Sequence, residues 1–137
     1  FEDFNIIADR HIAYENQAIL NANRYLFVDT NAITTAMFCL DYHGRLPEHL
    51  KQLALENVQR YDLFFLCEDD IPYDDTWDRS GPQKRTVFHQ HIIADLKQRR
   101  IPYISLTGDL EQRIKMVEHV LNRFEKYTNF YGRENQI

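Results

Sequence analysis

Three polar groups in this sequence follow apolar runs that have the length of a β-strand. The runs and the groups after them are Tyr25–Val28 with Asp29-Thr30, Leu63–Cys67 with Glu68-Asp69-Asp70, and Ile101–Leu106 with Thr107-Gly108-Asp109. In open parallel sheets, ligands bind at the carboxyl ends of the strands, so we expect the three groups along one edge. A polar residue also ends many buried strands for structural reasons alone. For each group taken singly, both interpretations stay open.

Asp29 has the most specific position of these residues. An apolar strand that ends in aspartate has the form of a Walker B segment, whose carboxylate holds Mg²⁺ or a water bound to it. The same carboxylate could act as a general base toward a substrate hydroxyl. In many α/β proteins, however, such an aspartate only caps a helix. Asp29 is therefore a candidate catalytic residue with a structural alternative.

The segment from Ile71 to Arg85 carries a second group of candidate residues. About fifteen charged and turn-rich residues are long for a purely structural connection between a strand and a helix. Its cations Arg79, Lys84 and Arg85 could grip phosphate oxygens, and the arginines could do so bidentately. The alternative is a solvated loop whose acidic and basic side chains pair with one another.

The elements that must position these groups alternate along the chain. Apolar runs without polar alternation are typical of strands buried on both faces, as in parallel sheets. A helix is expected from about residue 12 to residue 23, and three later segments have apolar residues at helical spacing. Those stripes are Leu50, Leu53, Ala54 and Val58; Phe88, Ile92 and Leu96; and Leu110, Ile114, Val117, Leu121 and Phe124. Asp109 stands where the N-cap of the last helix belongs. The pattern predicts an α/β protein with a parallel sheet.

Composition excludes several classes of protein. The 137 residues carry a net charge of −5, which disfavours a general nucleic-acid-binding surface, and no apolar run is long enough to span a membrane. Two cysteines in apolar stretches cannot build a disulfide framework. The histidines and cysteines lack zinc-ligand spacing, so no metal ligand is assigned. The four glycines also cannot form G-x-x-x-x-G-K-[ST], the phosphate-binding loop.

One string of residues resembles a known family. The string Phe27-Val28-Asp29-Thr30-Asn31-Ala32-Ile33-Thr34-Thr35, followed by Phe38-Cys39 and Tyr42-His43-Gly44, is similar to the ribosylnicotinamide kinase domain of NadR-type proteins. That family has F-[IV]-D-T-[DN]-x-x-T-T, then F-C and Y-x-G. The upstream helix with His11 and Tyr14 has the family's spacing, and the segment 72–79 looks like its lid. The similarity runs from about residue 3 to residue 121.

The resemblance implies a three-layer P-loop kinase fold, with a parallel sheet flanked by helices. Such enzymes use ATP and Mg²⁺ to phosphorylate the ribose 5′-hydroxyl of nicotinamide riboside, giving nicotinamide mononucleotide in NAD biosynthesis. The resemblance also implies a cytoplasmic enzyme with a nucleoside substrate, while the net charge and the short apolar runs disfavour nucleic-acid and membrane binding by this segment. By carry-over, the site residues are Asp29 and Arg79 (catalytic), Tyr14, Thr30 and Asp75 (substrate-binding), and Arg85, Thr107 and Gly108 (nucleotide-binding). Within these sets, Tyr14 is expected to stack on the nicotinamide ring, and Thr107-Gly108 to lie near the adenine.

This sequence departs from the family in two places. Trp77 and Asp78 replace small and aliphatic residues of the lid, and the first strand with its phosphate loop is not present. We therefore expect residues 1–126 to be the C-terminal portion of a kinase domain and 127–137 to be a polar, loosely ordered tail. A nucleotidylyltransferase domain could precede the kinase, as in NadR-type proteins. The alternatives are a related nucleoside kinase, a non-catalytic binding or regulatory module, and an α/β domain whose strand-end polar residues are only caps.

Overall fold

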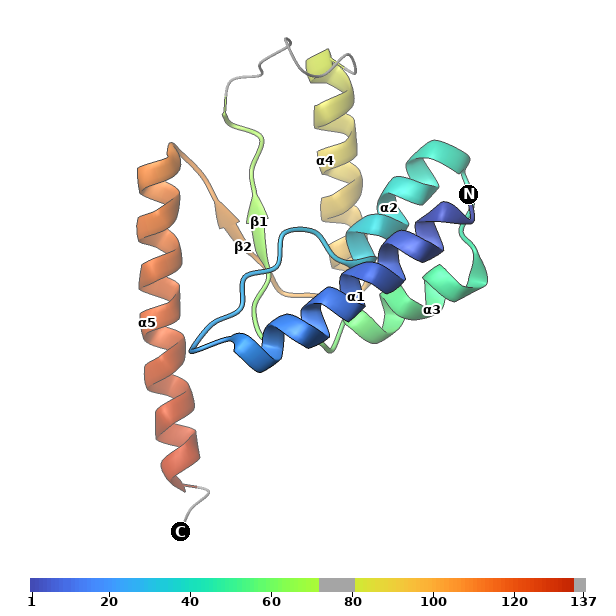
Figure 1. The fold of residues 1–137 in the computed structure, drawn as a ribbon. Coiled ribbons are helices and arrows are strands. Elements are labelled where there is room, and N and C mark those ends of the chain that lie inside the picture. Colours follow the sequence, from blue (N-terminus) through green and yellow to red (C-terminus); the bar gives the residue numbers. More distant parts are fainter. Residues whose placement is uncertain (72–80, 135–137) are drawn as a thin grey trace. The chain divides into compact units, whose positions relative to one another are not determined.

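Two compact units make up the chain, which we describe from a computed structural model (Figure 1). The structure describes the backbone of residues 1–71 and 81–134 and the side chains of residues 1–71 and 85–124. The first unit consists of residues 1–64 and 87–102, and the second of residues 65–86 and 103–137.

The first unit is built on three helices that pack on one another: α1 (Asp3–Asn21), α2 (Ala32–His43) and α3 (Glu48–Asn57). Its core contains many small side chains, which allow the helix axes to approach closely. The fully buried members, with at most 1% of their surface exposed, are Ala8, Ala32, Ala36, Cys39, Leu50 and Ala54. The later part of α4 (Gly81–Gln98) also belongs to this unit, and Phe38 of α2 stacks on Phe88 of α4 at 4.7 Å between ring centroids.

Both ends of α2 are set by local sequence. The Asn31 side chain accepts a hydrogen bond from the backbone N–H of Thr34 at 3.0 Å, as an N-cap does. At the other end Gly44 adopts a left-handed φ of 67°, and its N–H donates to the carbonyl oxygen of Leu40. The Asn31 cap fixes where α2 begins, and with it the position of the residues just before the helix, while Gly44 fixes where the helix ends.

A buried polar network joins α1 to the segment after α3. Glu15 of α1 is only 7% exposed and accepts hydrogen bonds from the Arg60 guanidinium and the Tyr61 hydroxyl, each at 2.7 Å. Burial and the hydrogen bond to Glu15 raise the pKa of Tyr61 well above its usual range. The phenol therefore stays protonated and keeps donating to the carboxylate.

The second unit contains a parallel pair of strands, β1 (Phe65–Cys67) and β2 (Ile104–Leu106), with Leu66 opposite Ser105. Helix α5 (Leu110–Glu134) follows β2 and packs against it. Asp109 and Gln112 form a reciprocal capping box at the start of α5, since each side chain accepts from the other residue's backbone N–H at 2.8–2.9 Å. The predicted N-cap role of Asp109 is confirmed.

The predicted α/β class with a parallel sheet is confirmed, but three details of the prediction were wrong. The helix expected from about residue 12 begins at Asp3, because no proline or glycine interrupts the preceding residues. Tyr25–Val28 forms no strand, and Phe27 is 65% exposed. A strand needs a hydrogen-bonded neighbour, and in the part of the chain that the structure describes only β1 and β2 pair. The segment expected to be loosely ordered from residue 127 is helical to Glu134, because a well-capped helix propagates at little cost per residue. Among the described residues, no helix is long and apolar enough to cross a membrane.

Candidate functional site

Asp29 and Thr30 lie in the irregular segment that leads into α2, and both are exposed. Within the described part of the chain, no hydrogen bond or ion pair engages the Asp29 carboxylate. Thr30 has a left-handed φ of 63°, which is strained for a β-branched residue. Strain of this kind persists where surrounding structure imposes it, and it is enriched at functional sites. An exposed carboxylate of this kind suits Mg²⁺, which binds oxygen ligands and retains water.

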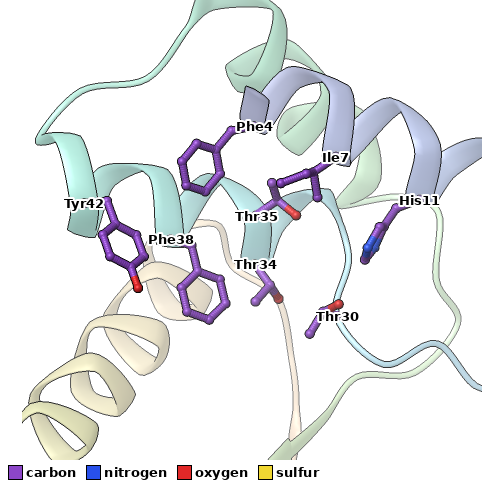
Figure 2. Close-up of a pocket in the computed structure, with 8 residues that line it drawn as sticks. All are labelled: Phe4, Ile7, His11, Thr30, Thr34, Thr35, Phe38 and Tyr42. Carbon is purple, nitrogen blue, oxygen red and sulfur yellow. The ribbon is translucent and has the colours of Figure 1, made fainter. Parts of the chain in front are cut away.

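Thr30 also lines an open pocket of about 220 Å³ that is bordered by α1, α2 and the segment before α2 (Figure 2). The lining residues are Phe4, Ile7, His11, Thr30, Thr34, Thr35, Phe38 and Tyr42. Figure 2 shows His11 and Thr30 at one end and the rings of Phe38 and Tyr42 toward the other. The pocket therefore has a polar end at Thr30, the residue after Asp29 in the sequence, and an aromatic end further along α2; Asp29 itself is not among the lining residues.

The two threonines of α2 are oriented by the helix cap. The Thr35 hydroxyl donates to the carbonyl oxygen of Asn31 at 3.0 Å, and the Thr34 hydroxyl lies 3.4 Å from the Asn31 side-chain oxygen. A hydroxyl that donates within the protein keeps its lone pairs as acceptors. The pocket can thus accept hydrogen bonds from a ligand, while its aromatic end offers stacking surface.

Tyr14 lies one turn after His11 on α1, and its side chain is 77% exposed. It is not among the residues that line the pocket. Its expected stacking on the nicotinamide ring stays a prediction. Asp75 and Arg79, the two expected lid residues, lie outside the described residues.

In the second unit, the expected nucleotide-binding residues Thr107 and Gly108 form the turn between β2 and α5. The Gly108 N–H donates to the Asp70 carboxylate at 2.6 Å, and Arg113 donates to the Gly108 carbonyl oxygen at 2.9 Å. Arg113 also forms an ion pair with Asp70. The Gly108 N–H bond, and after it the Arg113 charge, hold the pKa of Asp70 below its usual range. Two strand-end groups predicted from the sequence, Glu68-Asp69-Asp70 and Thr107-Gly108-Asp109, are thereby brought together.

Arg85 holds the chain that leaves β1. Its guanidinium donates to the carbonyl oxygens of Asp69 and Ile71, both at 3.1 Å. In this arrangement Arg85 fixes the same end of the sheet from which Asp70 reaches Gly108. Its expected contact with a nucleotide phosphate remains a prediction.

Sequence reasoning did not find the Asp70–Arg113 pair or the aromatic end of the pocket. The spacing of Phe38 and Tyr42, four residues apart on α2, places both on one helix face. For Arg113 the available signal was weaker: it stands four residues after the N-cap Asp109, on the turn nearest the strand ends.

Comparison with known proteins places the chain in a family. A family model described as an AAA domain matches residues 2–113. The chain is 32% identical over 106 residues to the trifunctional NAD biosynthesis/regulator protein NadR of Salmonella typhimurium, and 31% identical over 106 residues to NadR of Escherichia coli. Each match covers 76% of this chain and 25% of the relative, so the chain spans about a quarter of the length of these curated relatives. No solved structure is significantly similar. The resemblance to NadR-type proteins is confirmed, and the chain belongs to the AAA domain family.

Proposed function

We propose that residues 1–126 are the C-terminal portion of a kinase domain that phosphorylates nicotinamide riboside to nicotinamide mononucleotide in NAD biosynthesis. The observation that carries the proposal is the pocket of the first unit, which joins Thr30, next to Asp29, to a group of aromatic side chains. The names of the relatives assign them to NAD biosynthesis, which supports the proposal that this chain acts in NAD biosynthesis too.

The chemistry of the pocket suits this substrate. Nicotinamide riboside carries a quaternary pyridinium ring, and a cation over an aromatic face is stabilised by the ring's quadrupole. Phe4, Phe38 and Tyr42 supply such faces, and the threonine hydroxyls and His11 can hydrogen-bond a ribose. At about 220 Å³ the pocket is smaller than the roughly 300–1,000 Å³ typical of drug-sized ligands. That size suits a ring and a sugar better than a dinucleotide.

In the proposed reaction, the oxygen of the ribose 5′-hydroxyl attacks the γ-phosphorus of ATP, and Asp29 accepts the proton of that hydroxyl. The bond between that phosphorus and the β–γ bridging oxygen breaks, and ADP leaves. Thr107 and Gly108 would bind the adenine, Arg79 and Arg85 the phosphates, and Asp75 the substrate. When bound, Mg²⁺ would neutralise charge on the phosphates; the alternative role of Asp29 is to hold this ion or its water in place of accepting the proton.

Titration of the protein with nicotinamide riboside, followed by calorimetry, tests the binding half of the proposal. We expect saturable binding that Phe38→Ala weakens. The affinity of Tyr14→Ala tests separately whether Tyr14 stacks on the nicotinamide ring. The matched control is Leu55→Ala, another exposed apolar residue of the first unit that lies outside the pocket. Binding that Leu55→Ala and Phe38→Ala weaken equally would contradict the pocket assignment. Binding of the nucleoside without any ATP-dependent turnover would favour the non-catalytic module, and turnover of another nucleoside a related kinase.

A further inference from the structure

Arg113 is a buried charged residue that the proposed function leaves without a role. Only 7% of its surface is exposed, and arginine is seldom this buried unless it is paired. Its guanidinium donates to the carbonyl oxygens of Glu68 and Gly108, at 3.1 and 2.9 Å, and to the Asp70 carboxylate. The planar donor groups of Arg113 thus engage groups of the protein at the ends of both β1 and β2.

The Asp70–Arg113 ion pair holds the two peptide units that meet at Gly108. Gly108 gives its N–H to Asp70 and its carbonyl oxygen to Arg113. Since these two partners are also bonded to each other, the orientation of both peptide planes at Gly108 is fixed. We call the Asp70–Arg113 pair with Gly108 the turn clamp.

The conformation of the turn requires glycine at position 108. Gly108 has a left-handed φ of 85°, and a Cβ at this position would lie 2.1 Å from Oε1 of Gln112. The Gln112 side chain is itself held, because it accepts a hydrogen bond from the N–H of Asp109 in the capping box. Beside the clamped glycine, Thr107 remains exposed.

From this geometry we propose that Arg113 and Asp70 are positioning residues that set the backbone of Thr107-Gly108 for nucleotide binding. The inference rests on the proposed function, in which this turn binds the adenine of ATP. A buried ion pair is not by itself a strong source of stability, because desolvation offsets the attraction. A fixed turn, in contrast, lowers the ordering cost of binding. The clamp should therefore govern the affinity for ATP and leave the affinity for the nucleoside unchanged.

Arg113→Lys is the variant that tests the inference, because lysine keeps the charge but cannot reproduce the planar set of donors. In the full protein we expect the KM and Kd for ATP to rise about tenfold, which is about 1.4 kcal/mol and corresponds to the cost of ordering the backbone of roughly one residue of the turn on binding. The KM for nicotinamide riboside and kcat should stay within about twofold, which separates positioning from general damage. Asp70→Ala should act similarly, and the double variant should be little worse than either single one.

Arg99→Lys is the matched control. Arg99 pairs with Asp95 at 2.8 Å, and its side chain is also largely buried, but the pair touches none of the expected nucleotide-binding residues. Arg99→Lys should leave the KM for ATP unchanged. Should Arg113→Lys fail to fold, Asp70→Ala still tests the clamp, because 42% of the Asp70 side chain is exposed.

Three outcomes distinguish the inference from the proposed function. ATP binding that Arg113→Lys weakens, in a protein that does not phosphorylate nicotinamide riboside, would support the clamp and refute the proposed substrate. Turnover of nicotinamide riboside with an unchanged KM for ATP in both clamp variants would overturn the clamp and leave the proposed function standing. A wild-type protein that does not bind ATP would overturn both.

Discussion

Replacing Thr30 with glycine should make the protein more stable and its substrate binding weaker. The left-handed φ of 63° costs an L-residue roughly 1–2 kcal/mol, and a β-branched residue belongs at the upper end. Glycine removes that strain but loses more conformational entropy on folding, about 0.5–1 kcal/mol. The free energy of unfolding should therefore rise by about 1 kcal/mol in Thr30→Gly, which for a chain of this length raises Tm by about 4 °C.

The same substitution removes a hydroxyl from the polar end of the pocket and frees the backbone next to Asp29. We expect the affinity for nicotinamide riboside to fall about tenfold, the effect of one lost hydrogen bond together with a less ordered segment. Arg100→Gly is the matched control. Arg100 has a φ of 59° and follows α4 in a Schellman motif. Its N–H donates to the carbonyl oxygen of Lys97, and the N–H of Ile101 donates to the carbonyl oxygen of Leu96. Arg100→Gly should stabilise the protein by a similar amount without changing the affinity for nicotinamide riboside.

Thermal unfolding followed by circular dichroism, with calorimetric titration of the nucleoside, measures both effects on the same samples. A fall in Tm for Thr30→Gly would refute the argument from strain. An equal loss of affinity in Thr30→Gly and Arg100→Gly would refute the link between Thr30 and the pocket.

Three further predictions concern single side chains. Because the pKa of Tyr61 is raised in the folded state, the folded protein keeps a proton that the unfolded chain loses above about pH 10. The free energy of unfolding, measured with urea, should therefore fall as the pH rises beyond that point, and this fall should be shallower in Tyr61→Phe. A thiol reagent should label exposed Cys67 well before Cys39, which is buried, donates to the Arg45 carbonyl oxygen and has a pKa raised by burial; mass spectrometry of a partial reaction would contradict the fold if Cys39 reacted first. Asp29→Asn should remove most turnover in the full protein with Tm nearly unchanged, since the side chain is exposed; a large loss of stability would indicate a structural role instead.

Local signals in the sequence predicted much of the fold. The cap at Asp109, the apolar stripes of α3, α4 and α5, and the parallel pairing of the runs that became β1 and β2 follow from spacing and residue type. Helix α2 also carries local signals, Asn31 at its start and Gly44 at its end, although no apolar stripe drew attention to it. Tyr25–Val28 shows the limit of such signals. Its composition matches the other two runs, but strand formation depends on a neighbouring strand that composition does not reveal.

The candidate site was less predictable than the fold, because its residues are far apart in the sequence. Asp70 and Arg113 are separated by 43 residues, and only the pairing of β1 with β2 brings them together. The pocket combines side chains of α1 with Thr30 and two turns of α2, so it depends on how these helices pack. Asp29 and Thr30 could be singled out in advance because they follow an apolar run directly and needed no tertiary contact to be recognised.

The most direct test of the proposed function is the rate of nicotinamide mononucleotide formation from nicotinamide riboside by the full protein, with ATP and Mg²⁺. Product should be separated by chromatography and ADP release measured in parallel, with Asp29→Asn as the inactive control. The proposed function requires equal amounts of mononucleotide and ADP from the wild-type protein and very little of either from Asp29→Asn. Wild-type protein that binds both substrates but forms no mononucleotide, or an Asp29→Asn variant as active as wild type, would contradict it.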